Sequence, residues 1–201
     1  MKRLHILLLM LLTSLLAGAC SGSKSSGQQP QNLLRGAVTS SSDSLRLTRE
    51  YLTERIRSIY EHVFGLYGQV GSDFSQYATL KATNLDSLYC TQSWADLRKN
   101  VAQIDARKAE NGNPSVFLVA DYWIMGQDFH LPVLQKVTIL EQHHRRARAQ
   151  VEWKDFSDHS VEISLLYERG DWYIDNFIDT TPPEDGFWWK EAMQQYVRQN
   201  R

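Results

Sequence analysis

The feature that most constrains this 201-residue chain is a run of alternating apolar and polar side chains over residues 132–179. Alternate positions from 147 to 153 and from 161 to 167 are apolar, and turn-forming residues separate four such segments. A period of two is typical of strands that bury one face, and short turns join strands that run antiparallel. We therefore predict a four-stranded antiparallel meander with one face in the core.

The turns between these segments predict how the strands pair. Gly170-Asp171 has glycine first, as a type II′ turn requires, and three-residue loops fit at 143–145 and 156–158. The cross-strand pairs that follow are Ile139–Ala149, Val137–Val151, Trp153–Val161, Tyr167–Ile174, Leu165–Asn176 and Ile163–Ile178. On this register Gln135 and Asn176 are polar side chains on the buried face, while Tyr173 and Asp175 face away. A buried polar side chain needs a partner or a ligand.

Residues 1–19 have the pattern of a secretory signal peptide. Lys2 and Arg3 are basic, residues 4–16 are mostly apolar, and small residues at 17–19 precede Cys20. The apolar run is short for a permanent membrane span, and the small residues suit cleavage by a signal peptidase. We therefore expect residues 1–19 to be removed.

Cys20, directly after the small residues, resembles the lipobox of bacterial lipoproteins, whose cysteine receives a diacylglycerol and, after cleavage, a fatty acid such as palmitate. The alternative is ordinary secretion, with cleavage at Ala19 and a free Cys20. Residues 20–42 are rich in Ser, Gly and Gln, which indicates a flexible tether. We expect lipid anchoring to a membrane of the bacterial cell envelope, on the periplasmic face, because residues 21–25 lack the acidic residues that direct some lipoproteins to the cell surface.

The remaining residues, 43–201, suffice for one domain. The formal net charge of −1 becomes −3 once Lys2 and Arg3 leave with the signal peptide, so nothing points to nucleic acid. With Cys20 acylated, Cys90 is the one remaining thiol, and stability must come from packing without a disulfide. Two states stay open, a monomer and a homodimer.

Helical periodicity flanks the predicted sheet. One long amphipathic helix is expected over residues 44–67, capped by Ser42 or Asp43 and ended by glycines at 65, 68 and 71. The other expected helices are a short turn opened by Asn84 or Asp86, a helix over 93–109, and a last one from Glu184 or Gly186 to Arg198. Residues 116–131 are predicted as a loop or short strand. The fold class is therefore α+β.

Helices followed by a curved antiparallel sheet resemble the cone-shaped superfamily of nuclear transport factor 2, ketosteroid isomerase and scytalone dehydratase. More narrowly, the segments DYWIMGQD at residues 121–128 and WYIDN at residues 172–176 resemble a family of small bacterial lipoproteins, the domain of unknown function 3828. The resemblance covers residues 43–179. It implies a sheet that wraps the N-terminal helices and a pocket between them, and it implies no particular activity.

The resemblance also supplies candidate pocket residues. They are Asp121, Tyr122, Gln127 and Asp128 at the rim, Asn176 and Gln135 from the sheet, and Tyr89 from the helical part. An enzyme of the isomerase or dehydratase type would use Asp121 or Asp128 as its base and Tyr89 or Tyr122 as oxyanion donor. The alternative is that Asp121 caps a turn and Asp128 is solvated.

Other motifs point to no chemistry. Adjacent residues such as His143 and His144 point apart, and no further ligand stands at a metal-binding spacing, so we expect an exposed hairpin tip and no metal or cofactor. The sequence lacks a glycine-rich phosphate loop, a nucleophile elbow and an HExxH motif. We therefore expect a lipid-anchored binding or scaffolding module with a small-molecule or protein ligand, and an isomerase-type or dehydratase-type enzyme as the alternative.

Overall fold

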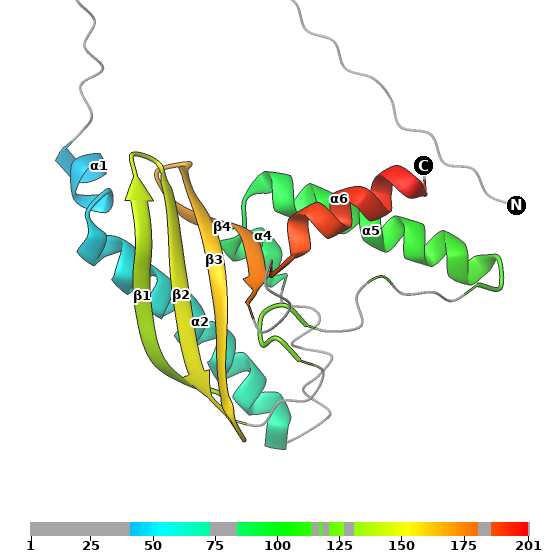
Figure 1. Cartoon of the computed structure of the whole chain (residues 1–201), viewed down its shortest axis with the longest axis horizontal. Coiled ribbons are helices and arrows are strands. Elements are labelled where there is room, and N and C mark those ends of the chain that lie inside the picture. Colours follow the sequence, from blue (N-terminus) through cyan, green and yellow to red (C-terminus); the bar gives the residue numbers. More distant parts are fainter. Residues whose placement is uncertain are drawn as a thin grey trace, which may run out of the picture. The chain divides into compact units, whose positions relative to one another are not determined.

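The computed structural model describes residues 41–72, 84–113, 117, 121–126, 131–180 and 186–200. They form an α+β domain in which helices precede and follow an open five-stranded antiparallel sheet (Figure 1). The fold class predicted from the sequence is confirmed. The signal peptide, Cys20 and the tether up to residue 40 lie outside the described residues.

The elements follow one another in a simple order. The helices before the sheet are α1 (Ser41–Arg46), α2 (Arg49–Ser72), α4 (Leu85–Tyr89) and α5 (Gln92–Glu110). The strands are β1 (Val133–His143), β2 (Arg146–Lys154), β3 (Asp158–Glu168), β4 (Asp171–Asp179) and β5 (Phe187–Trp188), and α6 (Trp189–Gln199) comes last. Each strand pairs with the next one along the chain. The sequence did not predict β5, which extends the sheet by two residues.

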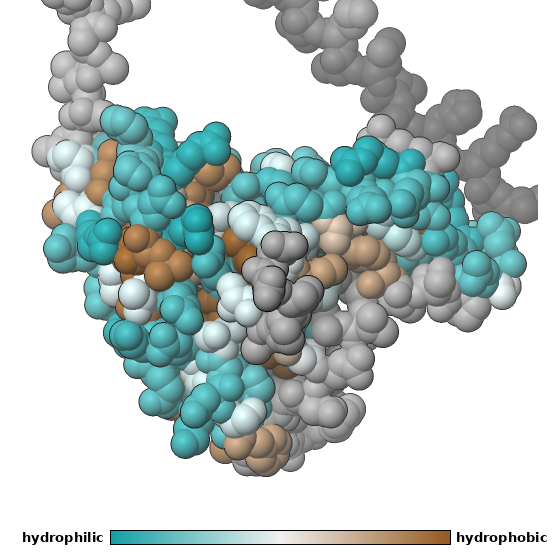
Figure 2. All heavy atoms as spheres, in the orientation of Figure 1, coloured by the Kyte–Doolittle hydropathy of each residue, from teal (hydrophilic) through white to brown (hydrophobic). Residues whose placement is uncertain are grey.

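The two faces of the sheet differ as the alternation predicts. The core face, toward α2, carries fully buried side chains such as Ala149, Val151 and Val161. The solvent face, opposite α2, carries the half-buried Gln150 and Glu152 between them. In Figure 1 the strands lie in front of α2, so the solvent face is toward the viewer, and Figure 2 shows mostly hydrophilic residues over it with smaller apolar patches.

In the first hairpin the predicted pairs are correct, but the predicted loop at 143–145 is not, because His143 pairs with Arg146 and a register shift between Ile139 and Glu141 makes up the difference. In the other two hairpins the predicted register is wrong. Ile139 pairs with Ala149 and Val137 with Val151, as expected. Val161 pairs with Val151 where Trp153 was expected, and Tyr167 pairs with Trp172 where Ile174 was expected. Both errors are slips of two residues next to the turn, so the side chains there stay on their predicted faces.

The turn residues explain the slip in the third hairpin. The turn is Arg169-Gly170, with φ angles of 52° and 79°, where the sequence suggested Gly170-Asp171. Two successive positive φ angles define a type I′ turn, which matches the twist of the flanking strands. Arg169 has a left-handed backbone conformation, and its side chain donates a hydrogen bond to the carbonyl of Cys90 at 3.2 Å.

A bulge in β4 changes the fate of Asn176. Ser164 pairs with Asn176 while Leu165 pairs with Ile174, so Asp175 is an extra residue without a partner on β3. Past a bulge of one residue the side chains exchange faces. Phe177 therefore joins the core face beside Ile163, and Asn176 moves to the face of Ser164. The prediction that Leu165 faces Asn176 on the core face is wrong for this reason.

The N-terminal helical segment is divided differently from the prediction. A break at Leu47-Thr48 separates α1 from α2, and the Thr48 hydroxyl accepts the backbone N–H of Tyr51 at 3.2 Å, as an N-cap does. Helix α2 then continues through Gly65 and Gly68 to Ser72. Its buried stripe consists of Leu52, Ile56, Ile59, Tyr60, Val63, Phe64 and Tyr67. Burial of this stripe outweighs the cost of about 1 kcal/mol for each helical glycine.

The remaining helices are close to their predicted positions. Asn84 caps α4 by accepting the N–H of Ser87 at 3.0 Å, and Thr91 caps α5 by accepting the N–H of Trp94 at 3.2 Å. Helix α5 ends at Glu110, one residue after its predicted end, and Gly112 follows with a φ of 75°. Helix α6 packs against α5 and β4 through Trp189, Met193 and Val197. It begins at Trp189 and not at residues 184–186, because β5 occupies the preceding positions.

Candidate functional site

The segment Asp121–Gly126 is a tight turn that projects two aromatic side chains into the core. The backbone N–H of Asp121 donates to Gly126 at 2.7 Å, and the reverse bond measures 3.2 Å. The Asp121 carboxylate accepts the backbone N–H of Trp123 at 2.8 Å and the hydroxyl of Tyr67 from α2. The turn thus places Tyr122 and Trp123 among buried side chains, 6 % and 3 % exposed respectively. Capping of a turn, one of the two roles considered for Asp121, is what the structure shows.

Asp86 on α4 is the centre of a second group of polar contacts. Its carboxylate accepts the hydroxyl of Tyr122, with 2.6 and 2.7 Å to its two oxygens, and the indole N–H of Trp123 at 3.3 Å. Arg98 on α5 forms an ion pair with Asp86 at 3.5 Å and donates to the Tyr122 hydroxyl at 3.1 Å. We call Asp86, Arg98, Tyr122, Asp121 and Tyr67 the carboxylate cluster. It ties α2, α4, α5 and the turn together.

Burial controls the protonation of this cluster. Desolvation raises the pKa of the Asp121 carboxyl above its ordinary value of 3.8, and the hydrogen bonds from Tyr67 and Trp123 oppose that rise. Burial, together with the neighbouring Asp86 carboxylate, raises the pKa of the Tyr122 phenol well above 10.0. The phenol therefore remains a donor at neutral pH. The phenol donates this proton in its hydrogen bond to the Asp86 carboxylate.

Among the described residues, the candidate base Asp121 and the candidate donors Tyr122 and Tyr89 make separate contacts, while Asp128 lies outside the described residues. Asp121 and the Tyr122 hydroxyl belong to different contacts, the first with Tyr67 and the second with Asp86. The hydroxyl of Tyr89, the other candidate donor, lies 2.5 Å from Nδ1 of His62. The guanidinium carbon of Arg55 lies over the Tyr89 ring, 5.6 Å from its centroid. The sequence identified Asp86 as a helix opener only, and nothing in its spacing indicated the contacts with Tyr122 and Arg98.

Asn176 is buried, with 3 % of its surface exposed, and both ends of its amide are used by α6. Its oxygen accepts the backbone N–H of Lys190 at 2.9 Å, and its nitrogen donates to the Glu191 carboxylate at 2.7 Å. The neighbouring Asp175 accepts from the Thr91 hydroxyl at 2.8 Å and from the Lys190 ammonium at 2.5 Å. The polar groups of the Asn176 side chain are therefore satisfied by Lys190 and Glu191 of α6.

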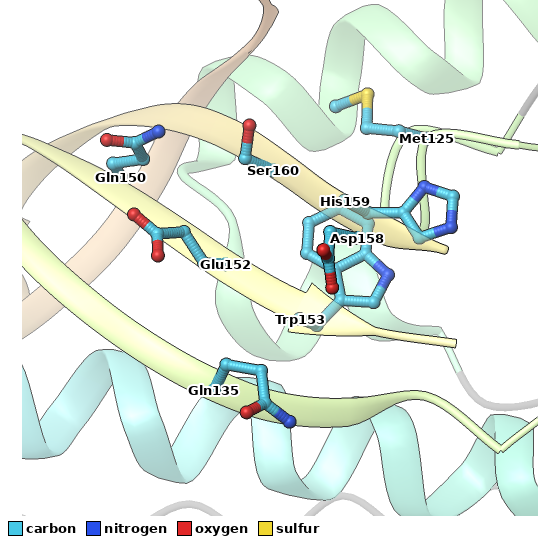
Figure 3. A pocket seen from close by; sticks show the side chains of 8 residues that line it. All are labelled: Met125, Gln135, Gln150, Glu152, Trp153, Asp158, His159 and Ser160. Atoms are coloured by element: carbon cyan, nitrogen blue, oxygen red, sulfur yellow. The ribbon is translucent and has the colours of Figure 1, made fainter. Parts of the chain in front are cut away.

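A hollow of about 410 Å³ lies at the end of the sheet where β2 turns into β3 (Figure 3). We call it the sheet hollow. It is lined by Met125, Gln135, Gln150, Glu152, Trp153, Asp158, His159 and Ser160. Gln150 and Glu152 belong to the solvent face by the alternation of β2. Ser160 is on the neighbouring strand β3, and Figure 3 shows the three side chains together.

Gln135 is the one sequence candidate that lines the sheet hollow. It is an extra residue in a bulge of β1, between the pairs of Leu134 and Lys136, and its side chain is exposed and donates to the carbonyl of Val133 at 3.3 Å. The prediction that it lies on the buried face is wrong because the bulge interrupts the alternation. Gln127 and Asp128 lie outside the described residues.

Two aromatic rings close the end of the sheet hollow. The His159 ring stacks on Trp153 with their centroids 5.5 Å apart and an angle of 13° between the planes. Nε2 of His159 lies 2.9 Å from the hydroxyl oxygen of Ser157. These contacts fix His159 beside Asp158, which begins β3 although the sequence pattern placed it in the loop 156–158.

Neither a metal centre nor a membrane span is found within the ranges that the structure describes. No three His, Cys, Asp or Glu side chains there come together in a way that could hold a metal ion. No helix in those ranges has the length and apolarity to cross a bilayer. His143 lies near Glu141 at 3.2 Å on the exposed end of β1.

The chain matches no protein-family model, no curated protein and no solved structure. The resemblance to the small bacterial lipoproteins therefore stays a prediction from the two short segments named above.

Replacement of Asn176 tests its structural role. Asn176→Leu leaves the Lys190 N–H and the Glu191 carboxylate without their partner, so we expect the free energy of unfolding to fall by about 1–3 kcal/mol. Urea unfolding monitored by tryptophan fluorescence measures the change. The matched control is Gln150→Leu, half-buried on the solvent face, which should change stability by less than about 0.5 kcal/mol. Equal effects of the two variants would contradict the role assigned to Asn176.

The raised pKa of Asp121 predicts a pH dependence of stability. Because the folded-state pKa lies above the unfolded one, the stabilisation is fully present below about pH 4 and is lost as the pH rises through the folded value. Asp121→Asn should remove this loss, so the difference in unfolding free energy between wild type and variant should shrink or reverse as the pH rises from about 4. Urea unfolding at a series of pH values measures it.

Tyr67→Phe serves as the companion variant. It removes the hydroxyl that holds the Asp121 pKa down, so the pH window of the stability loss should move upward. A window that moves downward, or a wild-type slope identical to that of Asp121→Asn, contradicts the assignment.

Proposed function

We propose that this chain is a lipid-anchored binding module whose ligand occupies the sheet hollow. The observation that carries the proposal is a set of polar side chains around a hollow that have no partner of their own. Within the ranges that the structure describes, Gln150, Glu152, Asp158 and Ser160 make no side-chain hydrogen bond and no ion pair. Small-ligand sites are hollows of about 300–1,000 Å³ in which a few placed polar groups orient the ligand, and the volume of the sheet hollow falls in this range.

The carboxylate cluster supports the same proposal by contrast. Asp86 and Asp121 have their oxygens occupied by Tyr122, Trp123 and Tyr67, and the rings around them pack edge to face. Phe177, Trp94 and Tyr122 lie with their ring centroids 4.8–5.1 Å apart. Side chains thus occupy this part of the interior between helices and sheet, where the sequence-based expectation placed a pocket. The hollow on the solvent face takes over that role in the proposal.

An isomerase-type or dehydratase-type enzyme remains the second candidate, and the raised pKa of Asp121 is the observation that favours it. A carboxylate whose pKa is raised by burial suits proton abstraction near neutral pH. The lining of the sheet hollow, however, does not include Asp121. The binding module needs no group other than those already at the hollow, so it is the better supported of the two.

The anchor and the address of the module rest on the sequence pattern of residues 1–20. In the proposal Cys20 carries the lipid, residues 21–40 act as the tether, and the domain faces the periplasm. A flexible tether of this length lets the domain reach a ligand at some distance from the membrane.

Filling of the sheet hollow tests the binding function. Ser160→Tyr places a ring on the solvent face of β3 inside the hollow, and Ser164→Tyr places the same ring four residues along the same face. Native mass spectrometry of the full chain, purified from its membrane fraction, should detect bound material in the wild type and in Ser164→Tyr. Ser160→Tyr should lose it, with unchanged circular dichroism. Equal retention by both variants sinks the proposal, and turnover that Asp121→Asn abolishes would favour the enzyme.

The lipid anchor has its own test. Cys20→Ala removes the acylated thiol, so the chain should move from the membrane fraction to the soluble fraction. Fractionation with immunodetection, together with labelling by a palmitate analogue, measures both consequences. Ser21→Ala is the matched control and should stay with the membrane. A Cys20→Ala chain that remains in the membrane fraction and is still labelled refutes lipidation at this position.

A further inference from the structure

Helix α1 lies at the end of the sheet where the β1–β2 and β3–β4 hairpins turn (Figure 1). The Tyr167 hydroxyl of β3 donates to the Asp43 carboxylate of α1 at 3.0 Å. The Gln142 amide of β1 donates to the carbonyl of Leu47, directly after α1, at 2.7 Å. Because both hairpins contact this segment, the three form one surface. We call it the hairpin end, and it consists of residues 41–49, 139–148 and 167–171.

The hairpin end is basic although the chain as a whole is acidic. It contains six arginines and four carboxylates, which is a formal charge of +2. Residues 20–40 add Lys24 and Arg35 and no carboxylate, another +2. Since the mature chain from Cys20 carries −3, these two positive contributions leave −7 for all remaining residues. The positive charge is thus gathered in the tether and in the surface that directly follows it.

Four of these arginines have no carboxylate partner within the described part of the chain. Arg46 and Arg49 donate to backbone carbonyls of the sheet, which leaves their charge in place. The guanidinium carbon of Arg145 lies over the Tyr167 ring, 5.6 Å from its centroid. Arg146 begins β2 and is exposed, as Arg145 is. The cations of the β1–β2 tip are therefore accessible from solvent.

The carboxylates of the hairpin end, by contrast, already have partners. Glu168 and Asp171 each form an ion pair with an arginine at 3.0 Å. Glu141 lies 3.8 Å from Arg148, and Asp43 accepts a tyrosine hydroxyl. The charge that this surface presents to a partner is therefore positive, and it is complementary to an anionic surface.

The tether joins the domain at this same surface. Residue 40 is followed directly by Ser41 of α1, and 20 residues separate Ser41 from Cys20. A flexible chain of that length has a root-mean-square end-to-end distance of about 25 Å. A lipid on Cys20 therefore keeps the attachment point on the hairpin end within about this distance of the bilayer. Leu45 on α1, 65 % exposed, adds an apolar side chain to the surface.

We propose that the hairpin end binds the anionic phospholipid headgroups of the membrane to which Cys20 is anchored. The inference rests on the lipid anchor of the proposed function and specifies which surface of the domain meets the bilayer. Basic clusters next to a membrane anchor are attracted by anionic lipids, and this attraction strengthens an acyl anchor. Strand β2, nine residues long, then places the sheet hollow up to about 30 Å from the headgroups.

The test is cosedimentation of the unlipidated mature chain, residues 20–201, with sucrose-loaded vesicles under reducing conditions. This chain has no acyl group, so its binding reports the protein surface alone. The vesicles consist of phosphatidylcholine, or of phosphatidylcholine with one third of the anionic phosphatidylglycerol. We expect binding to the anionic vesicles only, and the affinity should fall as the salt concentration rises.

Substitutions assign the binding to the hairpin end. Arg145→Gln combined with Arg146→Gln removes two positive charges there and should weaken binding to the anionic vesicles by about tenfold. Lys99→Gln combined with Arg107→Gln on α5 changes the net charge equally and should leave the affinity unchanged. All four side chains are exposed, so we expect the fold to be retained, and circular dichroism checks it.

Each outcome bears on a defined part of the proposal. Equal loss in the two double variants contradicts the hairpin end as the site, and equal binding to neutral and anionic vesicles contradicts the role of charge. Absence of binding to any vesicle overturns the inference and leaves the lipid anchor standing. Binding of polyglutamate without binding of vesicles assigns the surface to an acidic protein and also overturns the inference. Failure of the Cys20→Ala test above overturns the anchor itself, and this measurement, made without a lipid, does not depend on it.

Discussion

The Asp86 carboxylate is the interaction on which the helical half of the domain depends. It lies on a five-residue helix that could not persist alone, since isolated helices of that length are unstable in water. Three donors from two other segments, the Tyr122 hydroxyl, the Trp123 indole and the Arg98 guanidinium, converge on it. A carboxylate taken from water requires such compensation, so these contacts hold α4 against α5 and against the 121–126 turn.

That constraint also explains how the interior between the helices and the sheet is occupied. Once Tyr122 and Trp123 are turned toward Asp86, their rings lie against Phe177, at 4.8 Å in both cases. Phe177 reaches this place because the bulge at Asp175 exchanges the faces of β4. The side chain of the bulge residue, Asp175, accepts hydrogen bonds from Thr91 at the N-cap of α5 and from Lys190 on α6. One extra residue in a strand thus supplies both a core ring and the attachment of the last helix.

The sequence predicts those features that depend on local periodicity. It gives the fold class, the four long strands, Asn84 as one of two possible caps of α4, and the face of the strand residues in β2 and β3. The register slip in the third hairpin arises because the turn is Arg169-Gly170 and not Gly170-Asp171. This turn needs a left-handed backbone conformation at Arg169, and the identity of a non-glycine residue does not indicate such a conformation. The bulges at Gln135 and Asp175 break the period from which the site was inferred, and so Gln135 and Asn176 were placed on the wrong face.

The site was predicted less well than the fold because polar contacts are made between distant segments. Asp121 and Tyr122 are adjacent in sequence, yet the turn sends one toward Tyr67 and the other toward Asp86, 35 or more positions away in each case. The sheet hollow could not be seen either, since Glu152 and Asp158 look like ordinary solvent-face charges in an alternating strand. Glu162 forms its ion pair with Arg148 of the neighbouring strand, and a contact of this kind between two strands is identified only when the register is known.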